Sequence, residues 1–194
     1  MTARPISQGL EALRRLAAEG GAESARAVGK LVGIDAVLES VEAIASPAPE
    51  DLCAIAQGLG PELVAVGMEL VGPLFGRLLL FVGATDAERI ASRLVPAAPA
   101  GSLDALGESA LVEAGNVAGS AFVSAVARRV RAPLLHGVPR LTRGDARACI
   151  AELGGPGGGP ALASRLRCAG QPALLLFLPA ADRVPALVAA MEAR

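Results

Sequence analysis

Residues 78–81 read LLLF, and residues 174–177, which lie 96 positions further along the chain, read LLLF again. A similar segment follows each block, ATD at residues 84–86 and AAD at residues 180–182, and each leads into a pattern rich in alanine and leucine. Upstream of both blocks, segments of the same kinds recur in the same order. Self-similarity at a constant spacing indicates a duplication, so we predict that the chain consists of two related halves.

A segment without hydrophobic periodicity separates these halves. Residues 95–102 read VPAAPAGS, and two prolines and a glycine in such a stretch are typical of a linker. The chain has 194 residues, which is the size of one domain. We therefore expect a single domain made of two repeats, residues 1–98 and residues 99–194.

Each half is expected to contain a long helix, a strand, a short helix, two strands and a closing helix. Gly20-Gly21 could break the first long helix. In the first half the expected elements lie at residues 6–32, 34–43, 49–57, 63–71, 74–82 and 86–94. In the second half they lie at residues 103–130, 134–139, 143–153, 161–168 and 173–178, followed by a helix from Asp182. Strands joined by short turns, with the helices set apart, favour an α+β fold with pseudo-twofold symmetry, in which helices pack on one face of an antiparallel sheet.

Composition excludes several classes of protein. Hydrophobic residues make up 53% of the chain and charged residues 19%, which is typical of a globular protein and not of a disordered one. The 18 basic and 19 acidic residues give a formal net charge of −1. Because proteins that bind nucleic acid usually carry a clear basic excess, we expect no nucleic-acid partner.

The cysteines and the apolar segments predict a cytoplasmic protein without a membrane span. The three cysteines form no CxxC pair, and an odd number of scattered thiols fits a reducing compartment. The most apolar region, residues 63–84, is interrupted by Glu69 and Arg77, which a membrane span would not tolerate well.

The segment of residues 109–127, SALVEAGNVAGSAFVSAVA, carries a polar face on an otherwise apolar helix. At 100° per residue, Ser109, Glu113, Asn116 and Ser120 fall together on the side opposite the apolar stripe. Since Glu113 and Asn116 are three residues apart, their carboxylate and carboxamide groups project side by side.

The same segment contains residues that disfavour a helix. Gly115, Asn116 and Gly119 together cost the helix about 2 to 3 kcal/mol relative to alanine. Such departures are expected where a site or close packing requires them. Two interpretations follow: either the glycines allow close packing and Asn116 only faces solvent, or the polar face is functional.

The spacing on this face resembles a known signature. Ser109, three residues, Glu113, two residues, Asn116, 22 residues and Pro139 match the motif of the CheC/CheX/FliY family of response-regulator phosphatases. All four signature positions are present, and the duplicated layout is most similar to CheC. The resemblance implies a CheC-like fold and hydrolysis of the aspartyl phosphate of a CheY-like chemotaxis response regulator.

The resemblance also assigns roles to these residues. Asn116 would orient the attacking water, and Glu113 would engage a cationic group of the receiver domain. Ser109 would either hydrogen-bond the Glu113 carboxylate or face solvent, and Pro139 would shape the strand that follows the helix. No cofactor or metal of its own is implied, because the Mg²⁺ would belong to the receiver domain. The partners implied are a phosphorylated CheY-like receiver and a CheD-like receptor deamidase.

The first half departs from the signature. Alignment of the two long helices places Arg15 where the glutamate is expected, Ala18 where the asparagine is expected and Val41 where the proline is expected. We therefore expect one competent site for each chain, in the second half.

Two other readings of the function stay open. One is a non-catalytic chemotaxis adaptor or flagellar-switch component that binds a CheY-like or CheD-like partner. The other is an unrelated interaction module whose polar helix face is only solvated. The only histidine, His136, is expected to be structural. A group of arginines is expected either to favour the helix dipole or to steer an acidic partner. Its members are Arg128, Arg129, Arg131, Arg140, Arg143 and Arg147.

Overall fold

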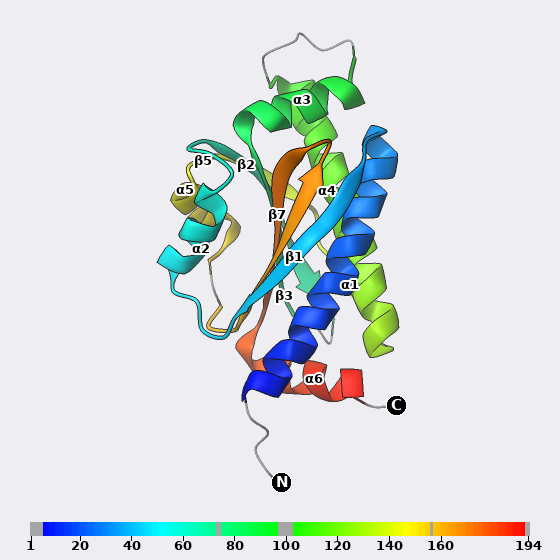
Figure 1. Ribbon diagram of the computed structural model, residues 1–194, viewed down its shortest axis with the longest axis vertical. Helices are drawn as coiled ribbons and strands as arrows, with labels where there is room; N and C mark the ends of the chain where they lie inside the picture. Colours follow the sequence, from blue (N-terminus) through cyan, green and yellow to red (C-terminus); the bar gives the residue numbers. More distant parts are fainter. Residues whose placement is uncertain (1–5, 73–74, 97–102, 156, 193–194) are drawn as a thin grey trace.

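The computed structural model describes residues 6–72, 75–96, 103–155 and 157–192, in which helices alternate with strands (Figure 1). The helices are α1 (Ile6–Val32), α2 (Pro49–Gln57), α3 (Ala84–Leu94), α4 (Ala105–Val130), α5 (Ala146–Leu153) and α6 (Val184–Glu192), which a short 3-10 turn at Ala181–Arg183 precedes. The strands are β1 (Ala36–Ile44), β2 (Leu63–Val71), β3 (Gly76–Gly83), β4 (Leu135–His136), β5 (Arg140–Gly144), β6 (Ala161–Cys168) and β7 (Gln171–Pro179). The predicted order of elements is therefore observed in both halves, with β5 as an addition.

The strands form one antiparallel sheet in the order β1-β6-β7-β3-β2-β4, and β5 also pairs with β2. The two LLLF blocks pair with each other at its centre, where Leu78 lies opposite Phe177 and Phe81 lies opposite Leu174. Exchanging each strand for its counterpart in the other half gives the same order read from the opposite edge of the sheet. The sheet therefore has the pseudo-twofold arrangement expected of a duplication. The expected linker at 95–102 lies largely outside the described residues, as does the predicted start of the third strand at Leu74, so the division at residue 98 stays a proposal.

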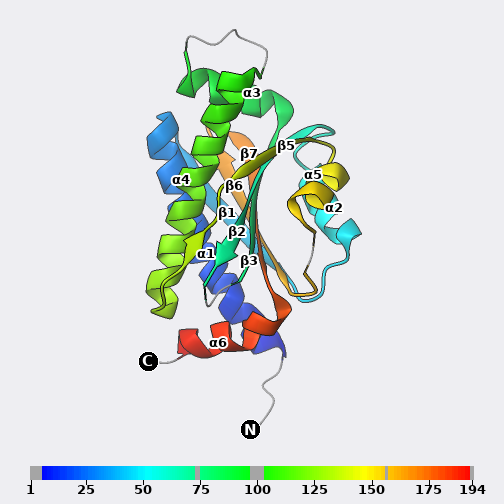
Figure 2. The same ribbon diagram turned by 180° about the vertical axis from the view of Figure 1, so that it is seen from behind.

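Both faces of the sheet are buried under helices. Along each strand the side chains alternate between the two faces and so contribute to two cores. On β3, Leu78 packs in a core that α1, α4 and α6 cover, whereas Leu79 and Phe81 pack in a second core under α2 and α5. Figures 1 and 2 show the long helices α1 and α4 on one side of the sheet and the short helices α2 and α5 on the other. The prediction of an α+β fold is confirmed. It placed helices on one face of the sheet, whereas in the structure α2 and α5 also cover the other face.

The helices α1 and α4 pack closely against each other at Gly20 of α1. A Cβ atom on Gly20 would lie 2.5 Å from the ring of Phe122, so only glycine leaves room for that ring. Phe122 in turn makes an edge-to-face contact with Phe177 on β7, with ring centroids 5.3 Å apart. The α1 helix is continuous through Gly20-Gly21, so the suggested break is wrong: the glycines serve packing.

The strand expected at residues 134–139 is also wrong. β4 ends at His136, and a separate strand β5 spans Arg140–Gly144, so that its last two residues lie where the expected helix at 143–153 was to begin. Gly137 donates its N–H to the backbone carbonyl of Glu69, but Pro139 has no N–H to continue the ladder with β2. The strand is therefore interrupted between His136 and Arg140, and Val138 is left 85% exposed.

Candidate functional site

The α4 helix is seated closely on the sheet through its two interior glycines. A Cβ atom on Gly115 would lie 2.5 Å from Cγ1 of Val66, and one on Gly119 would lie 2.2 Å from Sδ of Met68. Both contacts are too short for a real Cβ atom. At Gly115 the neighbour is the short β-branched side chain of Val66, so this position requires glycine, whereas at Gly119 it is the flexible end of Met68, which would have to move. The packing interpretation of the glycines is therefore confirmed, and it holds Asn116 on the outer surface of the helix.

The carboxylate and carboxamide lie together on this outer surface. Glu113 is exposed and Asn116 is partly exposed. Nδ2 of Asn116 donates a hydrogen bond of 3.3 Å to Oε2 of Glu113. Since a carboxylate only accepts hydrogen bonds, this contact turns the amide NH₂ group toward Glu113 and leaves Oδ1 of Asn116 available to another molecule.

The other two signature residues have structural contacts. The hydroxyl of Ser109 donates to the backbone carbonyl of Ala105 at 2.8 Å. The hydrogen bond from Ser109 to Glu113, which was one of its two expected roles, is therefore not observed. Pro139 lies in the interruption between β4 and β5 and is partly buried. Its place after the strand fits a role in shaping the backbone.

One polar contact beside this face was not expected from the sequence. Oγ of Ser120 lies 2.8 Å from Nε2 of His136, and Nδ1 of His136 lies 2.9 Å from the carbonyl oxygen of Gly137. Ser120 had been placed on the polar face, and His136 had been interpreted as structural. Only the pairing of β4 with β2, which joins His136 to Leu70, brings the imidazole beside α4.

The equivalent face of α1 confirms the helix alignment. Nine buried positions of α1 and α4 coincide when residue numbers differ by 98. The pairs are Leu13 and Leu111, Leu16 and Ala114, Ala17 and Gly115, Gly20 and Ala118, Gly21 and Gly119, Ser24 and Phe122, Ala25 and Val123, Val28 and Val126, and Val32 and Val130. The same shift places exposed Arg15 opposite Glu113 and Ala18 opposite Asn116, so the first half lacks the pair.

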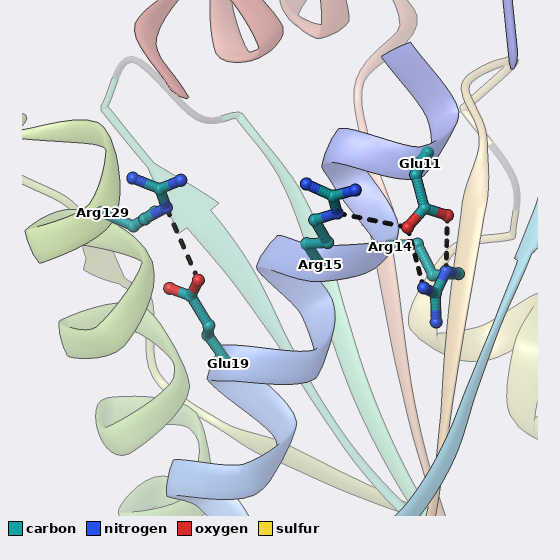
Figure 3. A network of polar contacts seen from close by, with 5 residues as sticks. All are labelled: Glu11, Arg14, Arg15, Glu19 and Arg129. Carbon is teal, nitrogen blue, oxygen red and sulfur yellow. Dashed lines mark hydrogen bonds and ion pairs between the residues drawn. The ribbon is translucent and has the colours of Figure 1, made fainter. Parts of the chain in front are cut away.

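An ion-pair network occupies that face of α1 instead (Figure 3). The Glu11 carboxylate accepts hydrogen bonds of 2.7 and 2.8 Å from Arg14 and one of 3.2 Å from Arg15. The Arg14 hydrogen bonds, with a smaller contribution from Arg15, lower the pKa of Glu11 from 4.5 to about 2. Next to this network, Glu19 pairs with Arg129 across the two helices at 3.5 Å.

Most of the arginine group forms ion pairs within the chain. Arg143 contacts Glu108 at 2.9 Å, and Arg147 contacts Glu50 at 3.7 Å. Arg140 lies 4.0 Å from Glu152. Only Arg128 and Arg129 lie in the last turn of α4, where they favour the helix dipole. These side chains are spread over several elements and do not form a single basic patch.

The described residues contain no cluster of metal-ligating side chains and one long apolar helix. No group of three or more His, Cys, Asp or Glu side chains in the described ranges could hold a metal ion. One helix among them, α4, is long and apolar enough to cross a membrane, but half of that stretch is buried against the rest of the fold. Partial burial of this kind is what the core helix of a packed domain shows.

Known structures share this arrangement of helices and sheet. Thermotoga maritima FliY superposes with a TM-score of 0.69 at 14% identity, over 98% of each chain. The chemotaxis protein CheX from Desulfovibrio desulfuricans gives 0.61 at 11% identity, over 85% of this chain and 99% of CheX. The fold is that of the CheC/CheX/FliY proteins. No family model matches the sequence, and no curated protein matches it either.

The same fold also occurs outside the chemotaxis proteins named above. The FliM middle domain from H. pylori superposes with a TM-score of 0.59 at 8% identity, over 98% of this chain and all of that domain. The CheC/CheX/FliY fold is thus shared with a flagellar protein. Since one fold carries different functions, the function of this chain has to be argued from the α4 face.

Proposed function

We propose that this chain hydrolyses the aspartyl phosphate of a CheY-like chemotaxis response regulator. The observation that carries the proposal is the exposed pair on α4, in which Asn116 donates to Glu113 and keeps its carbonyl oxygen free. The fold, which is shared with chemotaxis proteins, supports it.

The chemistry needs little from the protein. An acyl phosphate is already activated, so hydrolysis requires a water molecule held in line with the phosphorus and no covalent nucleophile. Oδ1 of Asn116 would accept a hydrogen bond from that water and direct its lone pair toward the phosphorus. Glu113 fixes the orientation of the Asn116 amide, and its exposed carboxylate has further lone pairs with which to bind a cationic group of the receiver. The Mg²⁺ in this reaction would be the receiver's own.

A second candidate is a non-catalytic adaptor or flagellar-switch component that binds a CheY-like or CheD-like partner. The observation that favours it is the loss of the pair on α1, where Arg15 and Ala18 stand at the equivalent positions, together with the fold shared with FliM. In that case the α4 face would bind without accelerating hydrolysis.

A phosphate-release assay separates the two functions. A CheY-like receiver is charged with a small phosphodonor and Mg²⁺, and its dephosphorylation is followed with the wild-type chain, Asn116→Ala and Glu113→Ala. Misplacing a reacting group by about 1 Å can cost about 10²-fold in rate, so we expect Asn116→Ala to lose at least that much of the acceleration. Arg15→Ala is the matched control, because it removes the counterpart of Glu113 in the first half. We expect its rate to equal that of wild type.

Each outcome has a clear meaning. Acceleration that is lost in both α4 variants and kept in Arg15→Ala supports the phosphatase. Binding of the receiver without acceleration by the wild-type chain supports the adaptor. A large loss in Arg15→Ala would show that the functional surface lies on α1.

A further inference from the structure

The polar face of α4 continues one turn beyond Asn116 to a serine that a histidine holds in place. Ser120 follows Asn116 by four residues, so the two side chains lie on the same side of the helix. Oγ of Ser120 is 2.8 Å from Nε2 of His136, which comes from β4 on the neighbouring edge of the sheet. Ser120 is exposed and His136 is partly buried. No step of the hydrolysis described above uses either residue.

The second contact of the imidazole fixes the direction of the first. Nδ1 of His136 lies 2.9 Å from the carbonyl oxygen of Gly137, which can only accept a hydrogen bond. Nδ1 therefore carries the proton, and in the neutral ring Nε2 has a lone pair. It follows that the Ser120 hydroxyl donates its proton to Nε2 and shows only the oxygen lone pairs to its surroundings.

We propose that Ser120, oriented by His136, is a specificity-determining residue of the docking face: a fixed hydrogen-bond acceptor for a donor on the receiver domain. This inference rests on the proposed function. Glu113, Oδ1 of Asn116 and Oγ of Ser120 are then all acceptors, in a row that spans about 10 Å along the helix. Such a row selects a partner surface that presents ammonium, hydroxyl or backbone N–H groups. His136 acts through Ser120 and is a positioning residue.

The test separates docking from chemistry. The Michaelis constant and kcat for a phosphorylated CheY-like receiver are measured with the wild-type chain, Ser120→Ala and His136→Gln. One hydrogen bond lost from the interface raises KM of Ser120→Ala by about 3- to 10-fold and leaves kcat within about 2-fold. His136→Gln keeps the wild-type KM, because a glutamine carbonyl accepts from the Ser120 hydroxyl and leaves its oxygen as the acceptor.

Further readouts keep the inference distinct from the proposed function and from a structural role. The dissociation constant for the receiver loaded with beryllofluoride, a stable phosphoryl mimic, is measured with the same three proteins. If wild type binds without accelerating hydrolysis, the phosphatase proposal fails, and a higher dissociation constant for Ser120→Ala still supports this inference. Equal dissociation constants for wild type and Ser120→Ala overturn the inference, as does a wild-type chain that does not bind the receiver. A change in the melting temperature of Ser120→Ala with unchanged KM would assign the pair to stability alone and also overturn it.

Discussion

Substituting Gly115 by alanine should destabilise the protein, although alanine is the better helix former. The gain in helix propensity is about 1 kcal/mol. Against it, the new Cβ atom would lie 2.5 Å from Cγ1 and 2.9 Å from Cβ of Val66. Val66 is 4% exposed, is β-branched and pairs with both β3 and β5, so it has little freedom to move. Overpacking of this kind costs up to about 3 kcal/mol. We therefore expect a net loss of about 2 kcal/mol in the free energy of unfolding.

Thermal and urea unfolding followed by circular dichroism measure this loss. For a chain of this size, about 2 kcal/mol corresponds to a fall in melting temperature of about 4 to 8 °C. Gly9→Ala is the control, because a Cβ atom there would lie at an ordinary 3.6 Å from Val188, and this variant should be at least as stable as wild type. In the Gly115→Ala background, Val66→Ala should cost less than it does alone, since it removes the clash. If Gly115→Ala were as stable as Gly9→Ala, the close seating of α4 on β2 would be refuted.

Two further predictions concern titratable groups. Hydrogen bonds from Arg14 hold the pKa of Glu11 at about 2, so Arg14→Ala should return it toward 4.5 in a carboxyl NMR titration. Because the folded-state value is the lower one, the network stabilises the fold above about pH 4.5, and that contribution is lost as the pH falls toward about 2. Burial raises the pKa of Cys168 to about 11, so at pH 8 its thiol should react with iodoacetamide about 100-fold more slowly in the folded protein than in urea. Equal rates in the two states would contradict its burial.

The features that the sequence predicted correctly are those encoded within one segment. The bounds of β2 and β6 matched the expected ranges because glycine and proline residues that favour turns border both segments. The outward placement of Glu113 and Asn116 followed from the period of the helix alone. The duplication was visible because the LLLF blocks are identical. In the structure these two blocks lie in β3 and β7, which pair at the centre of the sheet.

The features that the sequence missed depend on contacts between distant segments. Nothing in the sequence distinguishes Cys53 and Cys149, but both are buried in the second core under α2 and α5. The sequence predicted helices on one face only and therefore missed this core. The interruption at Pro139 could be read only once β2 was known to be the neighbour, because a missing N–H matters only beside an acceptor. The contact between Ser120 and His136 joins residues whose relation is set by the pairing of β4, so no local period predicts it.

The two long helices separate the residues that hold the fold from those to which a function is proposed. Nine of their buried positions correspond at a shift of 98 residues, whereas the pair Glu113 and Asn116 on the outer surface corresponds to Arg15 and Ala18. The helices run antiparallel, because Gly20 faces Phe122 whereas Ser24, further along α1, donates to the carbonyl of Ala118, which comes earlier in α4. The two faces therefore lie at opposite ends of the helix pair. By that register Arg15 lies level with residue 127 of α4, about 21 Å along the helix from Glu113. A receiver docked over Asn116 could therefore leave Arg15 uncovered, and the first face could change without cost to the second.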